Sequence, residues 1–227
     1  MISAVMLSWK RPENVYKIVP ELRKNEAIDD IIVWNNNPDE KLSFLKSIER
    51  VTVITPAADL GMNARWYASL LTKHDTIYMQ DDDLIVSNSA IKNLHSEWKK
   101  DPEVVHGIWG RSCKFNRYWA ITSAYPEAEM VMTRSVIFHK KYVRSFFKRI
   151  ATFKEDMLEL IKKGMEDICF SYFVMSETGR KNKTHRLFRE IEELPNPHSI
   201  KKRPKHWTNR TRMMRYCRKE FGIDRPK

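Results

Sequence analysis

The stretch Tyr78-Met79-Gln80-Asp81-Asp82-Asp83-Leu84-Ile85-Val86 places three consecutive acidic residues directly after an apolar run. The residues Thr76-Ile77-Tyr78-Met79 predict a buried strand. Three adjacent carboxylates repel one another, so a folded protein that keeps them near its interior compensates them, usually with a divalent metal ion. Mg²⁺ and Mn²⁺ prefer oxygen ligands and are commonly shared between carboxylates and substrate phosphates. The cluster therefore predicts a phosphate-bearing substrate, with a solvated acidic turn as the alternative.

The segments before this cluster alternate between predicted strands and helices. Apolar runs predict strands at 3–9, 30–34 and 51–54, and apolar residues at helical spacing predict helices within 15–22, 42–48 and 61–73. This alternation predicts an α/β fold with a mostly parallel central sheet flanked by helices. Ligands bind at the carboxyl ends of the strands in such sheets, which is where the acidic cluster stands.

The second half of the chain has a more mixed pattern. We expect strands at 103–109 and 130–138, and helices at 88–98, 153–163 and 167–175. The polar segment 178–197 predicts a mobile loop, and 208–220 predicts a basic helix within a basic C-terminal tail.

Length and composition favour a single domain, 1–227. No run of about 18 apolar residues occurs and the first residues lack the basic start of a signal peptide, so we expect no membrane span and a cytoplasmic protein. Three scattered cysteines predict reduced thiols. The net charge of +12, concentrated toward the C-terminus, predicts a polyanionic partner, with a generic basic surface as the alternative.

Several polar residues follow predicted strands or begin predicted helices. Asn35-Asn36-Asn37 follows a strand, as a base- or ribose-binding loop would, although an Asn-rich turn has the same pattern. Asn63 and Arg65 stand near a helix start and Arg11 precedes Pro12; each is a phosphate-binding candidate or an ordinary structural residue. Glu166-Asp167 predicts either a carboxylate that projects into a cleft from a helix N-terminus or a simple helix cap.

Together, these motifs resemble the exostosin-type C-terminal glycosyltransferase domain, a metal-dependent enzyme with the GT-A fold and a DXD motif. The resemblance covers most of the chain. It rests on the order and spacing of seven motifs: Ser3-Ala4-Val5-Met6-Leu7, Arg11-Pro12-Glu13, Ile32-Val33-Trp34-Asn35-Asn36, Asn63-Ala64-Arg65-Trp66, Asp81-Asp82-Asp83, Phe138-His139-Lys140-Lys141-Tyr142 and Glu166-Asp167-Ile168.

The resemblance implies roles for individual residues and segments. It assigns nucleotide-sugar binding to 1–86, the acceptor to 87–186 and a basic extension to 187–227. Asp81 and Asp83 would bind Mn²⁺ or Mg²⁺, Asp167 would stand near the anomeric carbon, and Arg210 or Arg212 would approach the diphosphate. The residues implied in donor binding are Arg11, Asn35, Asn36, Asn63, Arg65, Asp81 and Asp82. The sequence departs from the family at Thr133-Arg134-Ser135, where a smaller Thr-Gly-Ala-like segment is usual.

The expected function is transfer of a sugar from a nucleotide-diphosphate sugar, with a UDP-sugar favoured, to an acceptor hydroxyl. The family implies retention of anomeric configuration. The family also points to a glycan acceptor, whereas the basic C-terminus points to a modified base in DNA. A non-catalytic nucleic-acid-binding protein is the alternative from a different class.

Overall fold

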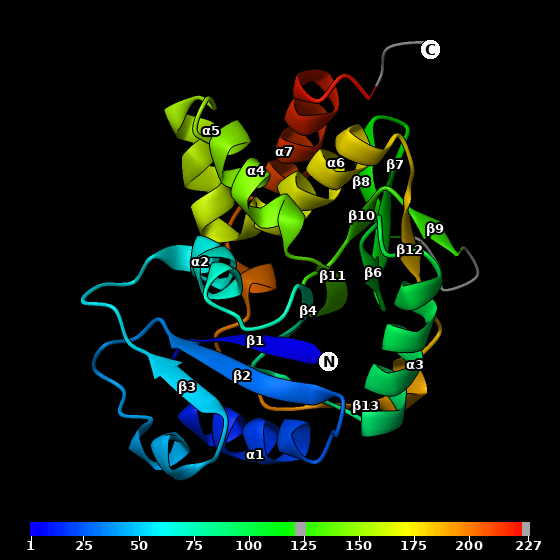
Figure 1. The fold of residues 1–227 in the computed structure, drawn as a ribbon. Helices are drawn as coiled ribbons and strands as arrows, with labels where there is room; N and C mark the ends of the chain where they lie inside the picture. Colours follow the sequence, from blue (N-terminus) through cyan, green and yellow to red (C-terminus); the bar gives the residue numbers. More distant parts are fainter. Residues whose placement is uncertain (121–125, 224–227) are drawn as a thin grey trace.

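The computed structural model of the protein describes residues 1–120 and 126–223. Its centre is a mixed sheet in the order β3-β2-β1-β4-β11-β6-β12-β9, in which β3, β2, β1 and β4 are mutually parallel (Figure 1). β11 pairs antiparallel with β4 and continues the sheet into the second half. The strands are β1 (Ile2–Ser8), β2 (Ile28–Asn35), β3 (Val51–Ile54), β4 (Thr76–Asp81), β6 (His106–Gly107), β9 (Glu127–Ala128), β11 (Ser135–His139) and β12 (Asn182–Thr184).

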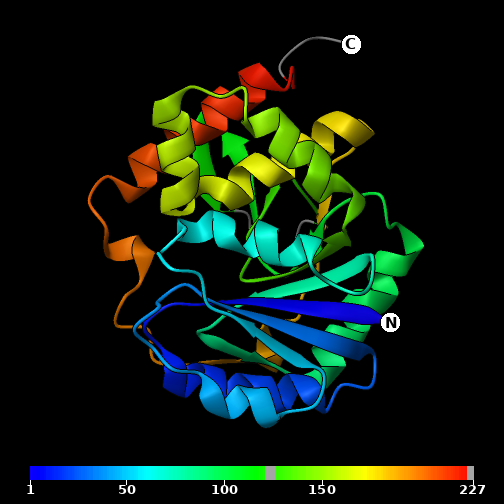
Figure 2. The same ribbon diagram turned by 60° about the vertical axis from the view of Figure 1, so that its left-hand side comes forward.

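Helices cover both faces of this sheet (Figure 2). Successive side chains of a strand point to opposite faces, so Met6 packs with α1 and α3 while Leu7 packs with α2, α4 and α6. Every residue of β1 is buried, which explains its continuous apolar run. The helices are α1 (Pro12–Arg23), α2 (Ala64–Leu70), α3 (Asn88–Lys100), α4 (Lys141–Ile150), α5 (Glu155–Leu160), α6 (Glu166–Thr178) and α7 (His206–Glu220).

The strand order creates a crevice at the carboxyl ends of β1 and β4. From β1 the chain proceeds to β2 and β3 on one side and then returns to β4 on the other side of β1. The connections after β1 and β4 therefore diverge, which is the topology at which ligands bind in open α/β sheets. The acidic cluster follows β4 at this point.

The first half of the chain confirms the predicted alternation of strands and helices, although two of the predicted helices are shorter than expected. The helix predicted within 42–48 is a 3₁₀ turn, Ser43–Ser47, and the helix predicted at 61–73 is a 3₁₀ turn, Gly61–Asn63, followed by α2. The helix predicted at 88–98 is confirmed as α3, and it is capped by Ser87, whose Oγ accepts a hydrogen bond from the Ala90 N–H.

Three expectations for the second half were wrong in extent. The strand expected at 103–109 is only β6, and the strand expected at 130–138 is divided into β10 (Met130–Val131) and β11. The segment predicted as a loop, 178–197, contains β12 and β13 (Ile191–Glu193), and β13 pairs antiparallel with β5 (Leu84–Val86). β6, β10, β12 and β13 contain only two or three residues each, which is too short to show an alternation of apolar and polar side chains. They are defined by their pairing with neighbouring strands and not by a local sequence pattern.

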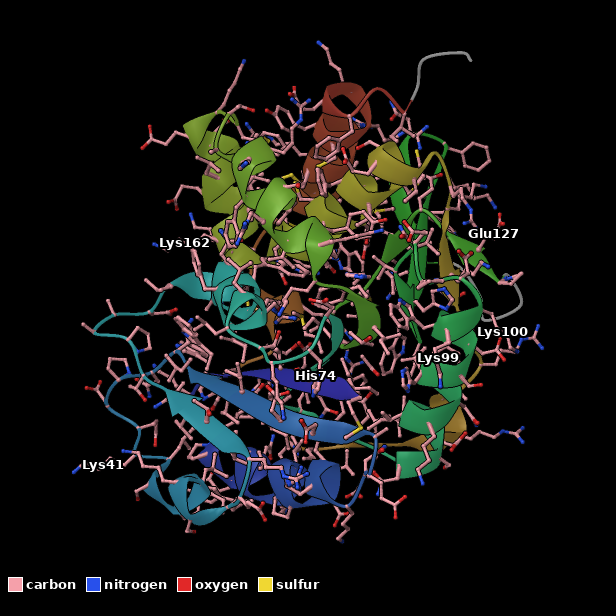
Figure 3. The ribbon with its side chains drawn as sticks, viewed as in Figure 1. Lys41, His74, Lys99, Lys100, Glu127 and Lys162 are labelled. Carbon is pink, nitrogen blue, oxygen red and sulfur yellow. The ribbon has the colours of Figure 1, made fainter. Side chains whose placement is uncertain are left out.

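The predicted basic helix is confirmed as α7, but it is part of the core and not a tail. Met213, Met214 and Cys217 are fully buried in the same cluster as α6. Exposed lysines such as Lys41, Lys99 and Lys162 extend from separate parts of the molecule (Figure 3). Exposed positive charges are therefore not confined to the C-terminal segment. Within the described residues, no helix has the length and apolarity needed to cross a membrane.

Candidate active site

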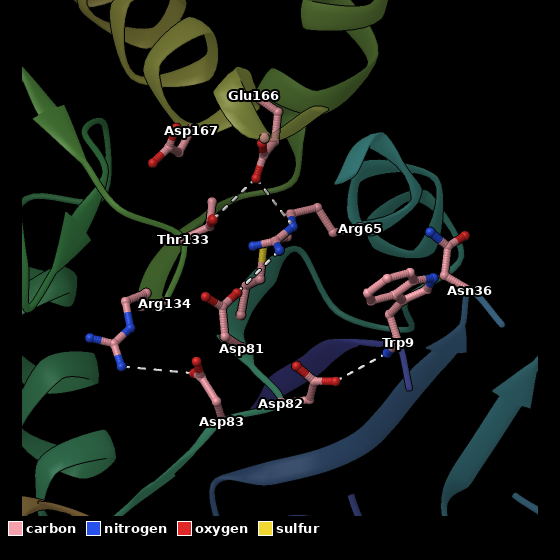
Figure 4. A network of polar contacts seen from close by, with 12 residues as sticks. Trp9, Asn36, Arg65, Asp81, Asp82, Asp83, Thr133, Arg134, Glu166 and Asp167 are labelled. Atoms are coloured by element: carbon pink, nitrogen blue, oxygen red, sulfur yellow. Dashed lines mark hydrogen bonds and ion pairs between the residues drawn. The ribbon is translucent and has the colours of Figure 1, made fainter. Parts of the chain in front are cut away.

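A cavity of about 620 Å³ lies at the carboxyl ends of β1 and β4. It brings together residues from both halves of the chain, and part of this site is drawn in Figure 4. The polar residues that line it include Arg11, Asn36, Arg65, Asp81, Asp82, Asp83, Arg111, Tyr118, Arg134, Asn196 and Arg210.

Asp82 is held against the loop that follows β1. Its Oδ2 accepts the Trp9 backbone N–H at 3.1 Å (Figure 4), and its Oδ1 lies 2.6 Å from Arg11 Nη2. Burial raises the pKa of Asp82 to about 7, against the opposing effect of the Arg11 charge. Asp82 therefore fixes Arg11 at the cavity wall.

Asp83 is surrounded by the polar side chains of Arg11, Arg134 and Asn196. Its Oδ2 accepts a hydrogen bond from Asn196 and lies 3.4 Å from Arg11 Nη1. Its Oδ1 is buried and makes no hydrogen bond, although Arg134 Nη2 lies 3.8 Å away. Burial raises the pKa of Asp83.

The donor set at this edge suits a hard divalent ion. Asp81 and Asp83 are separated by one residue, and both line the cavity. Asp83 Oδ1, which is buried and accepts no hydrogen bond, is the kind of group that an ion satisfies. Among the described residues no group of three or more His, Cys, Asp or Glu side chains converges on one point. One or two carboxylates together with substrate phosphates are the usual protein site for Mg²⁺, and Asp81 and Asp83 meet that requirement.

Arg65 connects the acidic cluster to α6. The side chain is buried, with Nη2 3.1 Å from Asp81 Oδ1 and Nε 3.5 Å from Glu166 Oε1. Thr133 Oγ1 donates to the same Glu166 oxygen at 3.3 Å (Figure 4). Burial raises the pKa of Glu166 to about 7, and the charge of Arg65 opposes this rise.

Asp167 and Arg210 form a second buried pair. The residues Ile161–Met165 form a wide π-type turn in which Gly164 has φ 110°, and α6 begins directly after it. Arg210 on α7 donates to the Gly164 carbonyl at 3.0 Å and to Asp167 Oδ2 at 2.5 Å. Arg210 lines the cavity, whereas Asp167 lies behind it and is 6% exposed.

The structure places the predicted site residues in two groups. Arg11, Asn36, Arg65, Asp81, Asp82, Asp83 and Arg210 line the cavity. Asn35 is buried and donates to the Glu40 carbonyl and to Thr55 Oγ1, so it orders the loop after β2. Asn63 lines a second depression beside Trp34. Arg212 points away from the cavity and pairs with Asp156 on α5.

Other lining residues were not predicted as site residues. Arg134 follows the break between β10 and β11, and Asn196 belongs to the segment predicted as a loop. Arg111, Tyr118 and Trp207 form the wall nearest Arg210, whose guanidinium carbon lies 4.6 Å from the centre of the Tyr118 ring. The departure at Thr133-Arg134-Ser135 was the one sequence signal for Arg134; the others carry no local motif.

Comparisons with known proteins agree with this architecture. The solved structure of GalNAc-T7 with UDP, GalNAc and Mn²⁺ aligns with a TM-score of 0.65 and 13% identity over 87% of this chain and 44% of that chain. Exostosin-2 of Mus musculus and of Homo sapiens are each 23% identical over 191 residues, which is 78% of this chain and 26% of their own length. The chain thus spans about a quarter of these relatives. The model of the glycosyl transferase family 64 domain matches residues 2–225. The chain therefore belongs to glycosyltransferase family 64, as the exostosin-type resemblance predicted, and has a GT-A fold.

Proposed function

We propose that this domain transfers a sugar from a UDP-sugar to a glycan hydroxyl with the help of Mn²⁺ or Mg²⁺. The observation that carries the proposal is the meeting, in one cavity, of the Asp81-Asp82-Asp83 cluster with the guanidinium groups of Arg11 and Arg210. The family and the ligands named for GalNAc-T7 support the class of donor.

Asp81 and Asp83 are the proposed holders of the divalent ion. When bound, that ion neutralises the negative charge that develops on the leaving diphosphate oxygen. Arg11 is placed to bind the same diphosphate, because its Nε and Nη1 are buried without a hydrogen-bond partner and the side chain lines the cavity. Guanidinium groups recognise phosphate through paired N–H donors, which is the contact that these atoms lack.

Arg210 and Asp167 are proposed to act together at the reacting end of the donor. Arg210 faces the cavity, so it is the group that reaches the diphosphate. Its bond to Asp167 holds that carboxylate behind the cavity wall, from where its negative charge would act on an oxocarbenium-like sugar. Retention of anomeric configuration, which the family implies, remains a prediction.

The wall formed by Arg111, Tyr118 and Trp207 is the proposed acceptor side. Trp207 is 56% exposed, and its ring centre lies 6.2 Å from that of Tyr118. Tyr118 Oη is buried without a hydrogen-bond partner. An aromatic face next to an unpaired hydroxyl suits a sugar ring with its own hydroxyl groups.

Three of the five Arg and Lys side chains of α7 are paired with carboxylates, which favours a glycan over DNA as the acceptor. Arg210 pairs with Asp167, Arg212 with Asp156, and Arg218 with Glu129. Positive charges that are already paired with carboxylates of the protein add little to binding of a phosphate backbone. Titration of duplex DNA binding against salt tests this choice, because a DNA acceptor requires a steep decrease in affinity as salt increases.

The test of the enzymatic proposal is release of nucleoside diphosphate from UDP-, GDP- and CDP-sugars with Mn²⁺, together with calorimetric binding of UDP. We expect metal-dependent turnover of a UDP-sugar, and loss of metal-dependent UDP binding in Asp83→Ala. Asp156→Ala, which removes an exposed carboxylate on α5, is the matched control. Undiminished metal-dependent binding in Asp83→Ala would refute the proposal.

A further inference from the structure

The segment that follows β13 places Asn196 beside the acidic cluster Asp81-Asp82-Asp83. The register pairs Glu193 with Leu84, and the Leu194 N–H donates to the Asp83 carbonyl at 2.8 Å. Asn14 Nδ2 ties the two segments together, because it donates to the Asp82 carbonyl at 2.9 Å and to the Pro195 carbonyl at 3.0 Å. The two residues before Asn196 are therefore held against Asp82 and Asp83, which places Asn196 beside Asp83.

Two buried oxygens at this point have no hydrogen bond. Asn196 Nδ2 donates to Asp83 Oδ2, whereas Asn196 Oδ1 and Asp83 Oδ1 are both buried and accept no hydrogen bond; the nearest cation to Asp83 Oδ1 is Arg134 Nη2, at 3.8 Å. Asp83 is 7% exposed, and both residues line the cavity. Buried polar atoms nearly always have a partner, and an ion or a ligand is a common explanation where they do not.

We propose that the side-chain amide oxygen of Asn196 is a further ligand of the divalent ion held by Asp81 and Asp83. This inference rests on the proposed function, which supplies the ion. An amide carbonyl is a hard oxygen donor. Because it is neutral, it adds a ligand without adding to the repulsion among the three aspartates. The ion would also connect the segment after β13 to the end of β4.

Calorimetric titration of the full chain with Mn²⁺ at saturating UDP tests the proposal without any measurement of activity. We expect Asn196→Ala to bind Mn²⁺ about 10-fold more weakly than the wild type, or weaker still. Asn196→Asp retains an oxygen but loses the N–H donor to Asp83, and we expect its affinity to stay within a few-fold of the wild type or to increase. Glu192→Ala, an exposed change on β13, is the control.

Two results would overturn the inference while leaving the proposed function intact. One is unchanged affinity in Asn196→Ala where Asp83→Ala abolishes binding. The other is equal weakening in Asn196→Asp and Asn196→Ala, because Asn196 would then act only as a hydrogen-bond donor to Asp83. If the wild type binds no Mn²⁺ with UDP present, the metal-dependent function and this inference both fail. Melting temperatures of each variant verify that the protein compared is folded.

Discussion

Replacement of Arg65 by Met tests the connection between the two halves of the site. Arg65 is 1% exposed and is shared between Asp81 and Glu166 at 3.1 and 3.5 Å. Met fills a comparable apolar volume but removes the charge. Removal of one partner from a buried ion pair costs about 3–5 kcal/mol, because the remaining charge is left uncompensated in a poorly solvated site. We therefore expect Arg65→Met to lower the free energy of unfolding by about 3–5 kcal/mol at pH 8.

The loss of unfolding free energy in Arg65→Met should be smaller at acidic pH because of Glu166. Its folded pKa of about 7 lies above the ordinary value of 4.5, so the folded state binds the proton more tightly than the unfolded state. The stability contributed by this group is complete below pH 4.5 and is lost as the pH rises through 7. Protonated Glu166 needs no counter-charge, so Arg65→Met should cost less at pH 5 than at pH 8. Glu166→Gln should recover part of the loss at pH 8.

Urea unfolding at pH 5 and pH 8 measures these differences. Arg212→Met is the matched control, since it removes the same side chain from an ion pair with Asp156 that is about half exposed. Exposed pairs contribute about 0–1 kcal/mol. If Arg65→Met and Arg212→Met destabilise the protein equally at pH 8, the assignment of Arg65 as a buried electrostatic bridge is wrong.

Two further predictions concern strain and protonation. Gly61→Ala should lower the free energy of unfolding, measured in urea, clearly more than Gly179→Ala. Both glycines have positive φ, but a Cβ at Gly61 would lie 2.4 Å from Lys162 Cγ, whereas a Cβ at Gly179 would meet no atom within 4 Å. Equal losses would contradict this steric account. His106 stacks on His185, and burial lowers its pKa to about 4, so its contribution is present above pH 6.5 and is lost as the pH falls through 4. We expect His106→Gln to flatten the decrease in unfolding free energy over that range by up to about 3 kcal/mol, and an unchanged slope would argue against it.

The sequence alone was sufficient to predict the parallel half of the sheet and the position of the acidic cluster at its edge. β1, β2 and β4 are buried on both faces, so their apolar runs are visible without any structure. The helical period of α3 and its Ser87 cap are likewise local properties. Because ligands bind where parallel strands end, the position of Asp81 and Asp83 alone made them candidate site residues.

Only the tertiary structure decided which other residues meet there. Arg210 and Arg212 are equivalent in the sequence, but two residues on a helix point about 200° apart, so α7 directs one to Asp167 and the other to Asp156. Asn196 reaches the aspartates through the pairing of two short strands far apart in the chain. Such strand pairing depends on the surrounding core and not on a local sequence pattern. The sequence by itself therefore determined the carboxylates and the sheet that presents them, whereas tertiary packing determined which side chains surround them.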